Sequence, residues 1–135
     1  MPDKKIRVLL VDDEPAILKT IGKRLELSGY EVITAADGEE ALTKAKFGSP
    51  EVIILDLMLS KMNGMEVCAT LKQDPQYRHI PIIIFTARGR EVDEKLCREC
   101  GADAYITKAQ HSKVLIEQID GLLARVLTKP KPEVA

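Results

Sequence analysis

The chain has 135 residues, of which 45% are hydrophobic and 30% are charged, and its formal net charge is −1. This length supports one domain with a single core, and the composition is ordinary for a globular protein. The near-neutral charge gives no reason to expect nucleic-acid binding, and no apolar run is long enough to span a bilayer. The segment before Asp12 is too short for a signal peptide and is soon followed by acidic residues, so we expect a cytoplasmic protein.

Five strands alternate with five helices in the elements predicted from the sequence. The first strand is nearly all apolar, and Glu14-Pro15 after it suits the first turn of a helix. Asp37 and Glu40 form a capping-box pair at the start of the second helix. In chain order, the predicted strands are residues 6–11, 31–35, 52–55, 80–85 and 104–107. The predicted helices are about residues 15–28, 37–48, 64–72, 90–100 and 112–127.

This alternation predicts a parallel sheet with helices on both faces. The count fits a flavodoxin-like, doubly wound α/β fold with five strands in the order 2-1-3-4-5 and five helices. Residues 128–135 hold two prolines and two lysines, which is typical of a flexible tail or a linker. The domain is therefore expected to span residues 5–127.

Polar side chains follow four of the five predicted strands. Asp12 and Asp13 follow the first strand, Asp56 follows the third, Thr86 ends the fourth, and Lys108 follows the fifth. In a parallel sheet these ends share one edge, and in this order the first and third strands are neighbours at the switch point where ligands bind. Three carboxylates are therefore expected to converge there.

The chemistry of this set points to phosphoryl transfer. Three carboxylates repel one another, and a hard divalent cation relieves that repulsion. Lys108 supplies a positive charge and Thr86 a hydroxyl donor for phosphoryl oxygens, and Asp56 can be the nucleophile. Taken singly, Asp12 and Asp13 could be helix caps and Lys108 a solvated surface charge. It is improbable that all of these residues are structural at matching strand ends.

The chain resembles the receiver domain of response regulators, the chemotaxis-regulator-like module of two-component signalling, over about residues 5 to 127. The resemblance rests on Asp12-Asp13-Glu14, the segment Asp56–Gly64, Thr86-Ala87, and Tyr105 three residues before Lys108. It implies that Asp56 accepts a phosphoryl group from a histidine kinase or a phosphotransfer protein. The domain would catalyse its own phosphorylation and slow self-dephosphorylation without being a conventional enzyme.

The resemblance also implies a cofactor, Mg²⁺ or Mn²⁺. Asp13, Asp56 and the backbone carbonyl of Met58 would bind the metal directly, and Asp12 would act mainly through water.

The same resemblance implies the phosphate ligands and the output. Thr86 and Lys108 would bind the phosphate, while Thr86 and Tyr105 would form the switch, Tyr105 moving inward on activation. The target would be a protein that docks on the face formed by the fourth helix, the fifth strand and the last helix, with no direct nucleic-acid binding by this domain.

The sequence departs from the family pattern at several positions. Ser60 and Asn63 stand where the family usually has Pro and Asp, and Ala109-Gln110 follows Lys108 where Pro-Phe is usual. The missing proline puts a cis peptide after Lys108 in doubt, because a non-proline cis bond costs about 3 kcal/mol. The catalytic set itself is intact.

Three functional readings follow. The first is a single-domain receiver that signals by protein contact, and the second is the receiver portion of a longer regulator, such as a transcription factor. The third is a Mg²⁺-dependent phosphatase of the haloacid-dehalogenase type, which the sequence disfavours because Asp12-Asp13-Glu14 lacks that family's Asp-x-Asp motif.

The three cysteines, Cys68, Cys97 and Cys100, are expected to act as small apolar residues. The CxxC pair among them lies at a helix end, whereas redox pairs of that spacing work at a helix N-terminus.

Overall fold

The computed structural model describes residues 5–86, 95, 98–107 and 112–127. Its strands are β1 (Arg7–Val11), β2 (Glu31–Ala35), β3 (Val52–Leu55), β4 (Ile82–Thr86) and β5 (Ala104–Thr107). Its helices are α1 (Pro15–Leu27), α2 (Gly38–Phe47), α3 (Gly64–Gln73) and α5 (Ser112–Leu127). Most of the helix predicted at residues 90–100 lies outside the described residues, although Lys95, Arg98 and Glu99 are helical.

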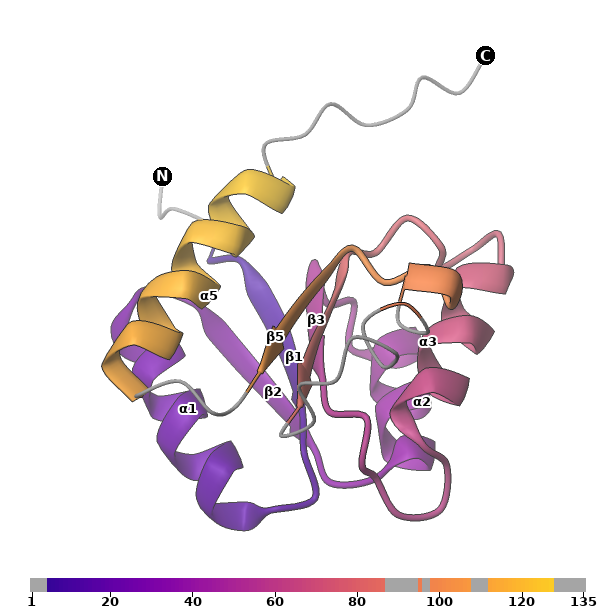
Figure 1. Ribbon diagram of the computed structural model, residues 1–135, viewed down its shortest axis with the longest axis horizontal. Helices are drawn as coiled ribbons and strands as arrows, with labels where there is room; N and C mark the ends of the chain where they lie inside the picture. The colour runs from indigo at the N-terminus through magenta and orange to yellow at the C-terminus, as the bar shows by residue number, and fades with distance from the viewer. Residues whose placement is uncertain (1–4, 87–94, 96–97, 108–111, 128–135) are drawn as a thin grey trace.

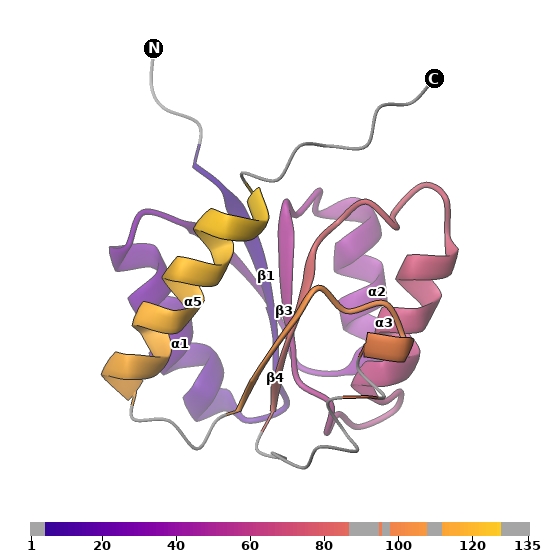
Figure 2. The same ribbon diagram turned by 45° about the horizontal axis from the view of Figure 1, so that its top comes forward.

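The five strands form one parallel sheet in the order β2-β1-β3-β4-β5, which confirms the predicted topology. The inner strand β1 pairs with β2 on one side and with β3 on the other, so that Val8 is in register with both Val32 and Val52. Helices α1 and α5 cover one face of the sheet, and α2 and α3 cover the other (Figures 1 and 2).

The apolar runs in the inner strands place apolar side chains on both faces of the sheet, because successive side chains of a strand point to opposite sides. Val8 and Leu10 belong to a cluster with residues of α1 and α5, and Leu9 and Val11 belong to a second cluster with residues of α2 and α3. All four side chains are fully buried. The core is therefore divided by the sheet into two parts.

Most element boundaries agree with the prediction, and two local differences have clear causes. The predicted fourth strand started at Ile80, but β4 starts at Ile82. Ile80 instead belongs to a turn, in which its N–H donates to the Tyr77 carbonyl at 3.0 Å and its carbonyl accepts a hydrogen bond from Lys72 Nζ at 2.9 Å.

The second difference concerns the capping box of α2. Asp37 accepts the Glu40 N–H at 2.8 Å, as predicted. Glu40 Oε1 accepts the N–H of Ala36 at 2.6 Å, one residue earlier than in the standard box. Among the described helices, none is long and apolar enough to cross a bilayer.

Candidate functional site

Three carboxylates converge at the carboxyl edge of the sheet, as the sequence predicted. Val11 and Leu55 are paired across β1 and β3, so the residues that follow them lie side by side. The ladder continues past both strands, because the Asp56 N–H donates to the Val11 carbonyl and the Asp12 N–H to the Ala35 carbonyl, each at 3.1 Å. Carboxylate oxygens of Asp12, Asp13 and Asp56 lie within 4.8 Å of one another.

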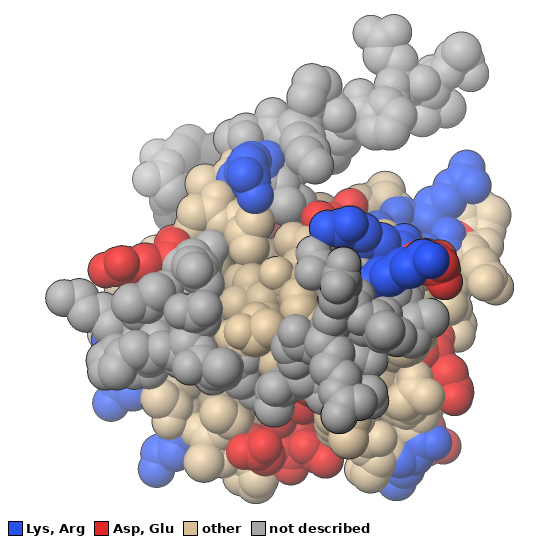
Figure 3. Space-filling model, in the orientation of Figure 1, with Lys and Arg blue, Asp and Glu red and all other residues tan. Residues whose placement is uncertain are grey.

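The three carboxylates differ in exposure and in the hydrogen bonds that hold them. Asp12 is fully buried and Asp56 is 3% exposed, whereas Asp13 is exposed to solvent. Asp12 Oδ1 accepts the Glu14 N–H at 2.9 Å, and Asp56 Oδ1 accepts the Met58 N–H at 3.2 Å. These bonds to the amide two residues ahead fix both buried side chains. In Figure 3, acidic side chains gather at the edge of the molecule where β1 ends, at the bottom of the view.

The loop between Asp56 and α3 is held in place by close backbone contacts. The N–H of Gly64 donates to the Leu57 carbonyl at 3.0 Å. A Cβ on Gly64 would lie 2.1 Å from the Asp56 carbonyl oxygen, which no side chain could tolerate without a backbone shift. The sequence predicted only that a helix begins near Gly64, because the close approach depends on how the loop folds back on its own strand.

The same loop also rests on the N-terminus of α2. A Cβ on Gly38 would lie 2.2 Å from the Met62 carbonyl oxygen. Lys61 has a left-handed backbone conformation, with φ of 68°, and its ammonium lies 3.6 Å from a carboxylate oxygen of Asp37. The hydrogen bond from the Glu40 N–H holds the pKa of Asp37 below its ordinary value against the effect of desolvation, and the nearby Lys61 adds to the lowering. The loop is thus anchored both on the end of its own strand and on the N-terminus of α2.

Thr86 and Tyr105 stand on the neighbouring strands. Leu55 is paired with Ile84, so Thr86 at the end of β4 reaches the same edge as Asp56. Thr86 is fully buried, and Tyr105 on β5 is half-buried against the cluster shared with α2 and α3. Lys108, Ala109 and Gln110 lie outside the described residues.

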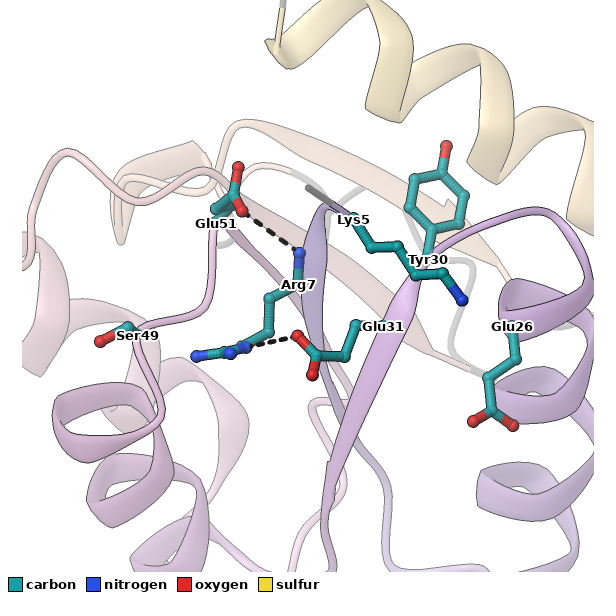
Figure 4. A pocket seen from close by; sticks show the side chains of 7 residues that line it. All are labelled: Lys5, Arg7, Glu26, Tyr30, Glu31, Ser49 and Glu51. Atoms are coloured by element: carbon teal, nitrogen blue, oxygen red, sulfur yellow. Dashed lines mark hydrogen bonds and ion pairs between the residues drawn. The ribbon is translucent and has the colours of Figure 1, made fainter. Parts of the chain in front are cut away.

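A separate hollow of about 530 Å³ lies at the opposite edge of the sheet, where the strands begin (Figure 4). Arg7 is at its centre, and its N–H groups donate hydrogen bonds to neighbouring groups of the fold. The side chain pairs with Glu31 at 2.8 Å and donates to the Gly48 carbonyl at 2.7 Å, and the backbone N–H donates to Glu51 at 3.4 Å. Because the guanidinium of Arg7 is already bound within the fold, the hollow presents no set of polar groups that point toward a common ligand. The acidic edge of the sheet therefore remains the candidate functional site.

The donor set at the acidic edge fits a hard divalent cation. Mg²⁺ and Mn²⁺ prefer carboxylate, carbonyl and water oxygens, and they are bound in proteins by one or two carboxylates with the remaining positions left to water or phosphate. A buried pair with one exposed carboxylate leaves such positions open on the solvent side.

Comparison with known proteins agrees with this geometry. The family model of the response regulator receiver domain matches residues 8–120. The alkaline phosphatase synthesis transcriptional regulatory protein PhoP of Bacillus subtilis is 44% identical over 119 residues, which are 88% of this chain and 49% of that protein. The chain thus spans about half the length of the curated relatives it matches.

Two solved structures show the same architecture. A CheY-like response regulator receiver domain protein from Methanospirillum hungatei JF-1 is 29% identical, with a TM-score of 0.83 and coverage of 94% of this chain and 100% of that one. The Mn²⁺-bound form of the response regulator Rcp1 is 30% identical, with a TM-score of 0.77 and coverage of 94% and 99%. With its fold, its acidic edge and its sequence in agreement, the chain belongs to the response regulator receiver domain family of two-component signalling.

Proposed function

We propose that this receiver domain is phosphorylated on Asp56. The observation that carries the proposal is the position of Asp56 within the carboxylate cluster. Asp12 and Asp13 follow one neighbouring strand, β1, and Thr86 ends the other neighbouring strand, β4. The Met58 N–H holds one of its oxygens, which orients the carboxylate at the edge of the sheet.

The phosphodonor is a phosphohistidine of a histidine kinase or a phosphotransfer protein. A carboxylate oxygen of Asp56 attacks the phosphorus, a P–O bond forms as the P–N bond breaks, and the departing imidazole takes up a proton. The Thr86 hydroxyl donates to one phosphoryl oxygen, and the ammonium of Lys108 pairs with another.

The residues of the acidic edge would also hold the cofactor. Asp13, Asp56 and the Met58 carbonyl would bind Mg²⁺ or Mn²⁺ directly, and Asp12 would act through water. When bound, the ion would offset the negative charge that accumulates as carboxylate and phosphoryl oxygens approach one another. The donor set supports this assignment, as does the Mn²⁺ bound to the related regulator Rcp1.

Intact-protein mass spectrometry tests the phosphorylation site. Incubation with acetyl phosphate and Mg²⁺ should add one phosphoryl group, and Asp56→Asn or a chelator should abolish the addition. Glu14→Gln is the matched control, because Glu14 is an exposed acidic residue next to the cluster but not part of it. Full labelling of the Asp56→Asn variant would refute the assignment.

The output surface is proposed to be the face formed by residues 90–100, β5 and α5. Tyr105 lies on this face two residues before Thr107, which is paired with Thr86, so a change at Thr86 can reach it through the strand pair. Activation would shift the population of a pre-existing conformation. Chemical shifts of residues 88–115 should move when beryllofluoride is added with Mg²⁺, and unchanged shifts there would contradict this choice of face.

A second candidate function is the receiver portion of a transcriptional regulator. Its support is the match to about half of PhoP, which is described as a transcriptional regulatory protein. The reading frame around the codons for this chain decides between the receiver portion of a transcriptional regulator and a single-domain receiver. A DNA-binding domain in the same frame would favour the regulator, and stop codons flanking the chain would favour a receiver that signals by contact.

A further inference from the structure

Two cysteines that are far apart in the sequence meet on the face of the sheet opposite α5. Cys68 is fully buried in α3, and Cys100 is half-buried in the turn that leads toward β5. In Figures 1 and 2 this short helical turn, drawn in orange, lies beside α3. The Cys68 thiol donates to the Cys100 carbonyl, with Sγ and O 3.6 Å apart. No disulfide joins them.

Lys72 lies one helical turn after Cys68 and binds α3 to the turn before β5. Its ammonium pairs with Asp103 at 3.0 Å and donates to the carbonyl of Ile80 at 2.9 Å. Gly101 has a φ of 96°, and a Cβ added to it would lie 3.0 Å from Cγ of Lys72, so the turn rests directly on this side chain. Lys72 therefore holds α3, which carries Cys68, against the turn that carries Cys100, independently of the contact between the two cysteines.

This arrangement gives the two sulfurs different reactivities. The hydrogen bond from Cys68 lowers the pKa of Cys100 to about 7, and the Lys72 ammonium acts in the same direction while burial opposes it. The pKa of Cys68 is raised, first by its hydrogen bond to Cys100 and then by burial, with the negative charge of Asp103 adding to the shift. Thiolates, not thiols, are the nucleophiles, so Cys100 reacts first at neutral pH.

We propose that Cys68 and Cys100 form an oxidisable dithiol that hydrogen peroxide converts to a disulfide between α3 and the turn before β5. The Cys100 thiolate attacks one peroxide oxygen, the O–O bond breaks, and the released hydroxide takes up a proton to give water and a sulfenic acid. The sulfur of Cys68 then attacks the sulfenic sulfur. The S–S bond forms, the S–O bond breaks, and the hydroxide leaves as water with the proton of Cys68.

The proposal revises the expectation that the cysteines only fill apolar space. The CxxC spacing drew attention to Cys97 and Cys100, but the contact that the fold creates joins Cys100 to Cys68 instead. Cys97 lies outside the described residues and takes no part in the proposed reaction.

Thiol counting and peptide mapping test the disulfide. The reduced, denatured chain should take up three maleimide labels, one per cysteine. After treatment of the folded protein with hydrogen peroxide it should take up one, and mapping should find a peptide that joins Cys68 to Cys100. Cys97→Ser is the matched control and should form the same cross-link. A Cys97–Cys100 link, a disulfide between two chains, or over-oxidation of Cys100 without a disulfide would overturn the proposal.

The reactivity of Cys100 provides a second measurement that needs no oxidant. Alkylation of Cys100 in the Cys97→Ser background should rise with pH about a midpoint near 7. Adding Cys68→Ala should slow alkylation at pH 7 about tenfold, because an ordinary thiol has a pKa of about 8.5 and is only a few per cent ionised there. Circular dichroism of each variant verifies folding. Equal alkylation rates with and without Cys68 in folded variants would show that the pair is not coupled.

Discussion

Removing one charge from the acidic cluster should stabilise the metal-free protein. Carboxylate oxygens of Asp13 lie within 4.8 Å of those of Asp12 and Asp56. At that separation, two unit charges in water repel by about 1 kcal/mol, so Asp13 contributes about 2 kcal/mol of repulsion from its two neighbours. Asp13 is exposed, and solvent and salt screen such interactions, so we expect Asp13→Asn to raise the free energy of unfolding by about 1 kcal/mol.

Urea denaturation in the presence of a chelator measures this change, and added Mg²⁺ should reverse it. An ion that binds the folded wild-type protein would stabilise it, whereas Asp13→Asn should gain much less stability from the same concentration of Mg²⁺. The stabilisation of the metal-free variant should also shrink in 1 M salt. Glu14→Gln is the control and should gain nothing, because it precedes α1 and lies outside the cluster. If the metal-free Asp13→Asn variant is no more stable than wild type, the carboxylates of the cluster do not repel one another as proposed.

Two further predictions concern the lifetime of the phosphate on Asp56 and the half-buried carboxylate of Asp120. Met58 is 55% exposed two residues after Asp56 and has no group that could position a water for hydrolysis, so the phosphorylated protein should persist for many minutes or longer. Met58→Asn should shorten that lifetime, measured as loss of the phosphorylated mass after the donor is removed, and an unchanged lifetime would exclude control by this position. Oδ1 of Asp120 in α5 is buried and has no hydrogen-bond partner among the described residues; burial raises the pKa of this carboxyl, against a smaller effect of a hydrogen bond with Ser28. The folded state therefore holds the proton more tightly than the unfolded state, and stability falls as pH rises from the ordinary value of 3.8 through the raised one. Asp120→Asn should raise the urea midpoint at pH 7, and the gain should disappear as pH falls through this window; a gain that is equal at pH 3 and pH 7 would contradict the assignment.

The fold could be predicted well from short apolar runs and from the regular alternation of strands and helices along the chain. The run Val52–Leu55 could be recognised as a strand buried on both faces, and the alternation of strands and helices placed it beside β1. Once the sheet order is known, the meeting of Asp12, Asp13 and Asp56 follows, because the ends of parallel strands share an edge.

The contacts that the sequence did not predict join segments that are distant along the chain. Lys72 and Asp103 are 31 residues apart, and Cys68 and Cys100 are 32 apart. Their meeting depends on how α3 packs against the turn before β5, and no periodicity or capping pattern encodes that packing. The late start of β4 has a more local origin, since Lys72 binds the carbonyl of Ile80, 8 residues further along the chain.

The division of the core by the sheet makes the two sides of the domain separable in evolution and in design. Leu10 and Phe85 contribute to the side covered by α1 and α5, while Leu9 and Leu71 contribute to the side covered by α2 and α3. Substitutions that share no packing partner usually have additive effects on stability. A lineage can therefore remodel the α5 side to recognise a new partner while the α3 side, which carries the dithiol, keeps its packing.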